Sequence, residues 1–512
     1  MTQSKRETER KYEPSSSGAD GLPDLTGVGP VASVTEAGAE ELDAVYHDTV
    51  DLRLAGTSAT LRRRTGGSDA GWHLKLPLTG DSREEVRAAL SDDVPEALRE
   101  LVLSRTRGAE LRPVVRVRSA RSVRHLRDAE GTVLAELSLD EVRADSLSGG
   151  GGRAEWRELE VELADGAPAG LLDSLERKLR KKGIARSDSP SKLARALRET
   201  GASAEVKPSR RASDKVVPGS PGAYVAAYVR EQVGILVALD PAVRRDLPDG
   251  VHKMRVTCRR LRGCLRSYRS VLDRRVTDPL RVELKWLAGE LGVERDQEVL
   301  RERLNGAVAE LPDDLVLGPV AARLRVWDVS RGDESRTRTR EALASARYLR
   351  LLDALDGLVR RPPLRAKAAG KPAPVMAKAV LKEYDRLAGR MDHALEQPPG
   401  QARDAALHQA RKAAKKVRYA AEVARPALGK PVARLGKRAK AVQKLLGEHQ
   451  DAVVAQDTLR ELAVAAHGAG ETAFTWGLLH GQERAGACAR QEELPSVWRA
   501  ASDPALRTAL NH

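Results

Sequence analysis

The stretch ETERKYE near the amino terminus places a charged residue at every second position: Glu7, Glu9, Lys11 and Glu13. In a β-strand, alternate side chains point to the same face of the sheet, so these four would lie together. Like charges on neighbouring positions repel one another. The spacing therefore predicts that something of opposite charge lies among the carboxylates.

Further segments up to about residue 163 alternate in the same way and are separated by turns rich in Gly and Asp. Many short strands joined by turns are typical of an antiparallel sheet closed into a barrel. Some strands carry acidic faces (ELEVEL) and others basic faces (LRRR), which favours a charged lumen with the apolar side chains outside, covered by helices. The expected strands lie at 46–55, 59–67, 71–78, 112–126, 132–142 and 156–163.

The character of the sequence changes after residue 163. Amphipathic patterns predict helices over 167–183 and 189–201, the second with Ser189 as its cap and Pro190 in its first turn. Residues 202–222 are rich in Ser, Pro and Lys, as linkers are. From about 223 onward the period is helical throughout, apart from a loop at 365–374, which predicts an all-α bundle.

The helical half contains an internal repeat. HKMRVTCRRLRG, starting at His252, matches HQARKAAKKVRY, starting at His408. Each copy precedes a second related stretch, LGVERDQEV and LGEHQDAVV, in which Asp296 matches Asp451. The repeat predicts two copies of one helical hairpin with approximate two-fold symmetry. The matched residues on one helix face are His252 with His408, Arg255 with Arg411, Arg259 with Lys415, and Arg262 with Arg418.

The first basic helix has no acidic residue between positions 252 and 269, although like charges one turn apart repel. A bound polyanion would reverse that repulsion, and the net charge of +15 fits such a partner. Single-stranded nucleic acid is usually gripped by aromatic stacking, and aromatic residues make up only 3% of the chain. No helix-turn-helix or zinc-finger pattern is present, so nucleic acid is not expected, although composition leaves duplex DNA open. A simple phosphate chain needs only charge and hydrogen-bond donors.

The chain of 512 residues is long enough for two or more domains, and 41% of it is apolar. Its three cysteines are too few and scattered for a disulfide framework or a zinc site. The first residues lack the apolar core of a signal peptide, and no window is apolar enough for a membrane span. These features favour a cytoplasmic protein.

Two families can now be named. Residues 7–200 resemble the CYTH domain of the triphosphate tunnel metalloenzymes, through ETERKYE, YHDTVDLRL, LRRRTGG, WHLKLP, SREEVR, WRELEVEL and SPSKL in that order. Residues 219–512 resemble the CHAD domain, the helical family named for its histidines, through the two basic helices. The resemblance implies a CYTH domain over 1–201, a linker over 202–218 and a CHAD domain over 219–512. It also implies that the first domain is an eight-stranded antiparallel tunnel.

The resemblance further implies roles for individual residues. The phosphate-binding positions are Arg62, Arg64, Lys75, Arg121 and Lys192, with Lys11 also facing phosphate. The metal positions are Glu7, Glu9, Glu158 and Glu160, for which Mg²⁺ or Mn²⁺ is the expected ion because hard cations prefer oxygen ligands. The catalytic set is Glu7, Glu9, Lys11, Glu85 and Asp140, and any of its acids could orient the attacking water. Glu84 is an alternative to Glu85, and Arg116 and Arg118 are alternatives to Arg121, while His73 is expected to be structural.

The leading hypothesis is a metal-dependent hydrolase of inorganic triphosphate or short polyphosphate, joined to a helical domain that binds polyphosphate through the eight matched residues of the repeat. One alternative is a scaffold that holds polyphosphate without hydrolysis, for example at polyphosphate granules. Another is a nucleotide or thiamine triphosphate phosphohydrolase or an adenylate cyclase, for which the scarcity of aromatic residues offers little to grip a ring.

Overall fold

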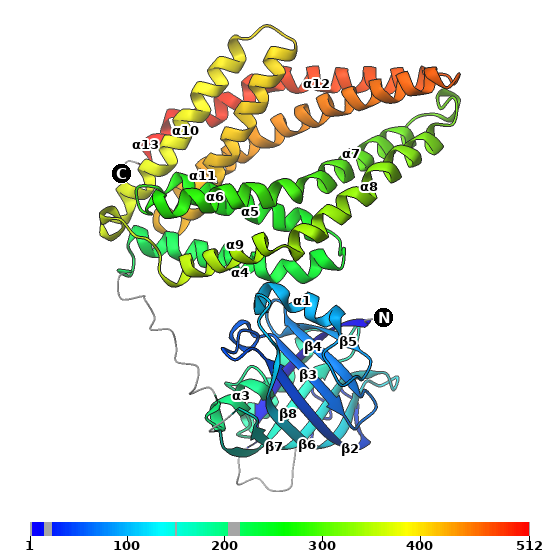
Figure 1. The fold of residues 1–512 in the computed structure, drawn as a ribbon, viewed down its shortest axis with the longest axis vertical. Helices are drawn as coiled ribbons and strands as arrows, with labels where there is room; N and C mark the ends of the chain where they lie inside the picture. Colours follow the sequence, from blue (N-terminus) through cyan, green and yellow to red (C-terminus); the bar gives the residue numbers. More distant parts are fainter. Residues whose placement is uncertain (1–2, 15–22, 149–150, 203–215, 511–512) are drawn as a thin grey trace. The chain divides into compact units, whose positions relative to one another are not determined.

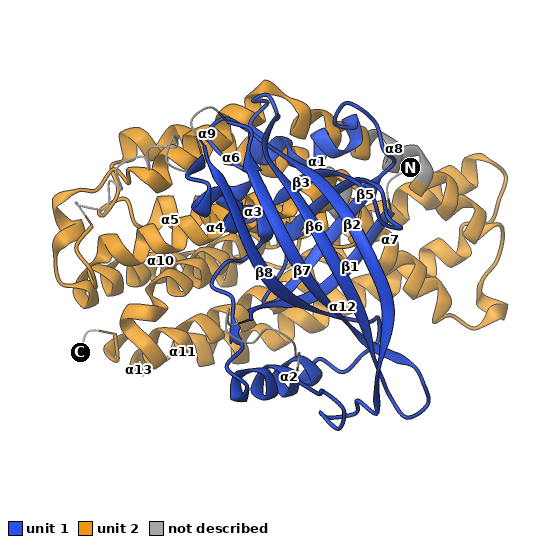
Figure 2. Ribbon diagram, turned by 90° about the horizontal axis from the view of Figure 1, so that it is seen from below, with its two compact units in different colours: residues 1–210 blue, residues 211–512 orange. Residues whose placement is uncertain are grey.

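The computed structural model describes residues 3–14, 23–148, 151–202 and 216–510, without the side chains of 293–296 and 329–335. The chain divides into two compact units, Met1–Arg210 and Arg211–His512, which Figure 2 colours separately. Most of the predicted linker, residues 203–215, lies outside the described residues.

The first unit is a closed antiparallel barrel (Figure 1). Its strand order is β5-β4-β3-β2-β6-β7-β8-β1, and pairing of β1 with β5 closes the ring. The two-residue strand β9 (Ala185–Arg186) adds to the end of β1. The eight-stranded antiparallel barrel predicted from the sequence is therefore confirmed. Its strands are β1 (Gln3–Glu13), β2 (Ser33–Asp48), β3 (Thr60–Thr65), β4 (Gly71–Pro77), β5 (Ser82–Ala88), β6 (Arg112–Arg127), β7 (Val133–Ser146) and β8 (Arg153–Leu163).

Two helices cover outward apolar faces of the barrel, as the alternating pattern predicts. α1 (Glu96–Thr106) packs Leu98 and Val102 against Trp72 and Leu74 of β4. α2 (Gly170–Lys181) packs its leucines against the outward side chains of β7 and β8, including Leu137 and Val161. The period of two thus leaves the opposite, charged side chains to face the lumen.

The third helix, α3 (Lys192–Glu199), lies differently. Its Leu193 and Leu197 pack against Val142 and Trp156, which share the inward face with the charged residues of β7 and β8. α3 therefore packs against the inner face at one end of the barrel, and the expectation that helices only cover the outside is wrong for this helix.

The start of α3 also differs from the sequence prediction. Ser191, not Ser189, is the N-cap, and its hydroxyl accepts a hydrogen bond from the backbone N–H of Ala194 at 3.1 Å. The helix begins at Lys192, whose side chain reaches the lumen.

The second unit is helical, as predicted, with one large core and a smaller one. The predicted loop at 365–374 instead contains a short 3-10 turn, Ala366–Ala369, and the start of α10. None of the helices in the described part of the chain has the length and apolar character needed to span a membrane. The helices are α4 (Pro221–Arg244), α5 (Gly250–Ser267), α6 (Arg274–Glu290), α7 (Gly292–Ala309), α8 (Val320–Ala344), α9 (Ala346–Arg360), α10 (Pro372–Glu396), α11 (Gln401–Gly468), α12 (Phe474–Ala501) and α13 (Pro504–Thr508).

The two copies of the sequence repeat lie on α5 and on the first part of α11. α11 is two helices joined at a kink, where Gly429 adopts φ 62° between Pro426 and Pro431. Gly263 of α5 lies so close to Tyr419 of α11 that an added Cβ would be 3.2 Å from the tyrosine. The two basic helices therefore pack directly against each other.

Candidate functional site

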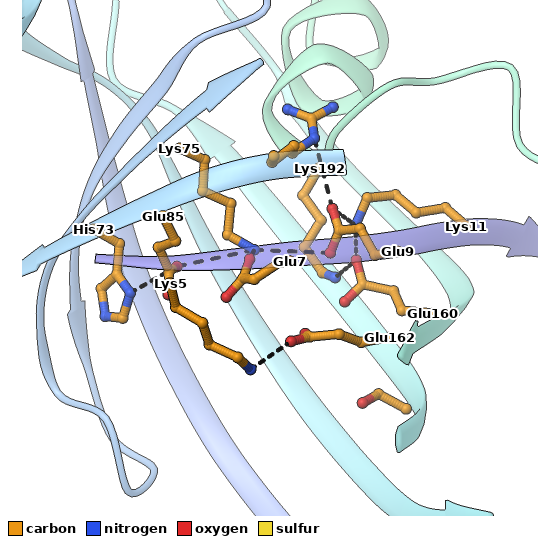
Figure 3. Close-up of polar contacts among 12 residues, drawn as sticks. Lys5, Glu7, Glu9, Lys11, His73, Lys75, Glu85, Glu160, Glu162 and Lys192 are labelled. Carbon is orange, nitrogen blue, oxygen red and sulfur yellow. Dashed lines mark hydrogen bonds and ion pairs between the residues drawn. The ribbon is translucent and has the colours of Figure 1, made fainter. Parts of the chain in front are cut away.

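The lumen of the barrel holds a cavity of ≈ 500 Å³ lined mostly by charged side chains, several of which are drawn in Figure 3. The alternating residues of β1, β3, β5 and β8 supply most of them, because every second side chain on each strand points inward. Acidic and basic residues face each other across this space. The spatial arrangement divides them into two acidic clusters and one basic wall.

The first acidic cluster comprises Glu7, Glu9 and Glu162, each of which offers a carboxylate oxygen within 4.8 Å of the others. Register explains this grouping, since Glu9 of β1 pairs directly with Glu162 of β8. Burial raises the pKa of Glu7, and the nearby carboxylates of Glu162 and Glu85 add to the increase while Lys75 opposes it. Carboxylates that lie this close repel one another, and a hard divalent cation bound among them would relieve that repulsion.

Glu162 was not among the metal positions taken from the sequence. It continues the alternation of Glu158 and Glu160 in ELEVEL, so the sequence pattern already predicts that its side chain points inward. Which of the three glutamates meets Glu7 and Glu9 depends on the pairing register of β1 and β8, which the sequence does not show.

The second acidic cluster comprises Asp140, Glu158 and Glu160. The ammonium group of Lys192 lies among these three carboxylates, 2.9 Å from Asp140 Oδ2 and 2.7 Å from an oxygen of each glutamate. Burial would raise the pKa of Asp140, but Lys192 and Arg121 outweigh it and hold that pKa well below its usual range. The predicted metal set is thus split, with Glu158 and Glu160 already neutralised by protein cations.

The basic wall comprises Arg62, Arg64 and Arg121. Burial lowers the pKa of Arg64 to about 9, and the guanidinium groups of Arg62 and Arg121 add to the decrease, so the three groups lie close together. Arg121 donates two hydrogen bonds to Asp140, at 2.8 and 2.9 Å, and one to Glu160 at 2.8 Å. Guanidinium groups gathered in this way are suited to phosphate oxygens.

Two lysines connect the basic wall to the acidic clusters. Lys75 Nζ lies 2.6 Å from Glu7 Oε2 and 3.7 Å from Glu9 Oε2. Lys11 forms ion pairs with Glu160 and, at 3.5 Å, with Glu9. Glu13, at the end of the same strand, instead accepts a hydrogen bond from Ser187 at 2.6 Å.

The sequence left two choices of site residue open, one on β5 and one on β6, and the structure decides both. Glu85 is buried in the lumen, whereas Glu84 bonds Ser4 on the outside of the barrel. Arg121 lines the cavity, whereas the other two candidates on β6 form exposed ion pairs with aspartates, Arg116 with Asp43 and Arg118 with Asp145. Further lining residues that the sequence analysis did not single out are Lys5, Arg83, Arg87, Glu40 and Glu136.

In the helical unit, four residues of the repeat come together across α5 and α11. Burial lowers the pKa of Lys415 to about 7, and the charges of Arg411, Arg259 and Arg255 add to the decrease. The same contact recurs in both copies: the guanidinium of Arg255 lies against Gly292, and that of Arg411 against Gly447. Four half-buried cations gathered in this way repel one another. Asp451, 3.6 Å from Arg411, offsets part of this charge, and an anion would relieve the repulsion that remains.

The other predicted residues of the repeat lie at the edges of this group. Arg262 extends it, since its pKa is lowered by burial and by the charges of Arg281 and Arg259. Arg418 is already partnered, donating to Gln443 at 2.7 Å and pairing with Glu422 at 3.4 Å. His408 lies beside Arg411, whereas His252 lines a separate cavity of ≈ 260 Å³. The side chain of Asp296 is outside the described residues.

Comparison with known families agrees with this architecture. A model of the CYTH domain matches residues 5–197, and a model of the CHAD domain matches residues 227–460. The chain is a CYTH–CHAD protein. Proteins of the CYTH family act on triphosphates and depend on a metal, and the acidic clusters of this CYTH–CHAD protein could hold one.

Two curated relatives of this CYTH–CHAD protein come from Mycobacterium tuberculosis, strains CDC 1551 and H37Rv, and both are described as uncharacterized. Each is 39% identical over 518 residues, covering 98% of this chain and 97% of the relative.

Similar solved structures each cover part of this chain. PptA from Streptomyces chartreusis is 23% identical, with a TM-score of 0.45, and covers 55% of this chain and 99% of its own. The CHAD domain from the plant Ricinus communis is 24% identical, with a TM-score of 0.40, and covers 59% of this chain and 96% of its own. HpAC1 from Hippeastrum, described as having a dominant triphosphatase activity, is 21% identical, with a TM-score of 0.24, and covers 38% of this chain and 96% of its own.

Proposed function

We propose that the barrel hydrolyses inorganic triphosphate or short polyphosphate with a divalent metal, and that α5 and α11 of the helical unit bind polyphosphate. The observation that carries this proposal is the cavity of ≈ 500 Å³, in which a basic wall faces a cluster of carboxylates. Phosphoanhydride hydrolysis needs both: cations for the phosphate oxygens, and acids for a metal and a water.

The cations of the tunnel are placed to exchange their partners for phosphate. Arg62, Arg121 and Lys75 now contact carboxylates, and phosphate oxygens offer the same kind of acceptor. Lys192, the first residue of α3, also lines the cavity and likewise contacts carboxylates. These cations bind the phosphate chain of the substrate, and one of the acidic residues orients the attacking water.

The first acidic cluster fits the metal that this chemistry requires. We assign Mg²⁺ or Mn²⁺ to Glu7, Glu9 and Glu162, because their oxygens lie together and all are hard donors. When bound, the metal would neutralise charge on the phosphate oxygens and polarise the bond that breaks. Glu160, which is already in contact with Lys11, Lys192 and Arg121, is better placed to position those cations.

Inorganic substrates are favoured over nucleotides and thiamine triphosphate by the cavity lining. Among the described lining residues the aromatic rings are Tyr46 and His125. The hydroxyl of Tyr46 lies 3.4 Å from Arg62, which directs it toward the basic wall. A base or a thiazolium ring would therefore find little to stack against.

Phosphate release from tripolyphosphate, ATP and thiamine triphosphate, with Mg²⁺ and with Mn²⁺, tests this proposal. We expect tripolyphosphate to be the preferred substrate and chelation of the metal to abolish turnover. Glu7→Gln should lower kcat by at least about 100-fold, because the metal cluster loses one carboxylate while the volume of the side chain is kept.

Glu155→Gln is the matched control, since Glu155 is an exposed carboxylate of β8 that points away from the lumen. It should leave kcat unchanged. Full activity of Glu7→Gln, or tight polyphosphate binding without turnover under either metal, would contradict the catalytic assignment and favour a binding protein.

A further inference from the structure

His73 of β4 lies in the wall of the tunnel, where both of its ring nitrogens face acceptors. Nδ1 is 3.0 Å from Glu85 Oε1 (Figure 3), and Nε2 is 2.9 Å from the backbone carbonyl oxygen of Asp69. Both His73 and Glu85 are 1% exposed, so water does not compete for either group. The pair therefore has a fixed and dry geometry.

The two contacts of His73 determine how many protons the His73–Glu85 pair must hold. A neutral imidazole carries one N–H, so it can donate to one of the two acceptors only. If Nε2 donates to Asp69, the lone pair of Nδ1 meets an ionised carboxylate, which is repulsive. Both contacts are satisfied only when the pair holds one additional proton, on Nδ1 of His73 or on Glu85.

When the tunnel holds no phosphate, the cations around His73 and Glu85 disfavour binding of the additional proton. Burial lowers the pKa of His73 to about 4, with the charges of Arg62 and Arg64 adding to the decrease and Glu85 opposing it. Phosphate oxygens beside these cations would cancel part of their charge and favour the proton instead. The charged and titratable groups that face His73 or Glu85 from the neighbouring strands and turn are Glu7, Arg62, Arg64, Asp69, Lys75 and Arg87.

We propose that His73 and Glu85 take up one proton from solvent when a phosphate chain enters the tunnel, and that the resulting ion pair fixes Glu85 against Lys75 and Arg62. His73 is then a positioning residue, since it acts on the substrate through Glu85 and the two cations that Glu85 contacts. The inference rests on the phosphate-binding part of the proposed function, but it does not require hydrolysis.

Calorimetry of tripolyphosphate binding to the full chain tests this inference, in EDTA and in two buffers of different ionisation enthalpy near pH 7. An Arg259→Ala/Lys415→Ala background should weaken binding by the helical unit, and all variants are compared within that background. We expect His73→Gln to take up about one proton fewer per tripolyphosphate than the background protein, and to bind about tenfold more weakly. Equal proton uptake by the two proteins would overturn the proposal.

His47→Gln is the matched control, because His47 is a half-buried histidine that packs against Trp72 and does not line the tunnel. Its proton uptake should equal that of the background protein. If His73→Gln does not fold, ¹⁵N-histidine spectra of the unaltered chain give the answer: tripolyphosphate should produce one imidazole with both nitrogens protonated, and its absence would overturn the proposal. Binding with this proton uptake but no turnover in Mg²⁺ would reject the hydrolase and leave the inference standing.

Discussion

At the scale of single residues, Lys11 connects phosphate binding to pH. Burial lowers its pKa to about 8; Glu9 opposes this change and Lys192 adds to it. The ammonium is therefore charged below that pH and loses its charge above it. Since only the charged form binds phosphate well, we expect KM for tripolyphosphate to rise by up to about tenfold per pH unit between about pH 8 and about pH 9. Steady-state kinetics in Mg²⁺ measure this rise.

Lys11→Arg separates this residue from the other titrating groups of the protein. A guanidinium keeps its charge over the whole range, so the rise in KM should be smaller in this variant. Lys182→Arg, at an exposed position after α2, is the control and should behave as the unaltered protein does. The same pH dependence in all three proteins would show that Lys11 does not set it.

At the scale of secondary structure, the N-cap of α3 decides where Lys192 lies. The Ser191 hydroxyl satisfies the N–H of Ala194, and Lys192 is the first residue of the helix. Ser191→Ala should cost about 1 kcal/mol of stability and let the first turn fray. We therefore expect a lower melting temperature together with a several-fold higher KM for tripolyphosphate, whereas Ser191→Asn should preserve both.

Ser220 provides a matched control for this element. It caps α4 in the helical unit in the same way, its hydroxyl accepting a hydrogen bond from the backbone N–H of Ala223 at 3.2 Å. Ser220→Ala should lower stability by a similar amount and leave KM unchanged. An unchanged KM in Ser191→Ala would argue that the position of Lys192 does not depend on the cap.

At the scale of the whole molecule, the two units have separate cores and separate charged sites. We propose domain boundaries at 1–201 and 219–512, so that the two activities should be separable in the full chain. Arg259→Ala/Lys415→Ala should lower polyphosphate retention by at least about tenfold, because two of the four clustered cations are removed, and should keep tripolyphosphate turnover. Glu7→Gln should lower tripolyphosphate turnover and leave polyphosphate retention unchanged.

Filter retention of long-chain polyphosphate and phosphate release from tripolyphosphate, measured on the same preparations, check this separation. Arg360→Ala is the control for general loss of charge, since Arg360 is exposed and pairs with Asp356 of the same helix. Loss of both activities in either variant would show that the two units work as one site.

The local patterns of the sequence determined the class of each half and the direction of most side chains. The period of two in ETERKYE and ELEVEL places the charges of β1 and β8 on one face, and the helical period with its repeat predicts α5 and α11. These features are local, because side-chain direction follows from the dihedral angles of one strand or helix. The closed barrel and the helical bundle were predicted on that basis, together with the family resemblance, and are confirmed.

Tertiary structure decided which charges meet. The register of β1 with β8 joins Glu162, rather than Glu158, to Glu7 and Glu9, and the entry of α3 into the barrel brings Lys192 to the second acidic cluster. Pairing between β4 and β5 sets the contact of His73 with Glu85, twelve residues apart. Such contacts depend on how strands far apart in the chain align and close, and no period within one strand carries that information.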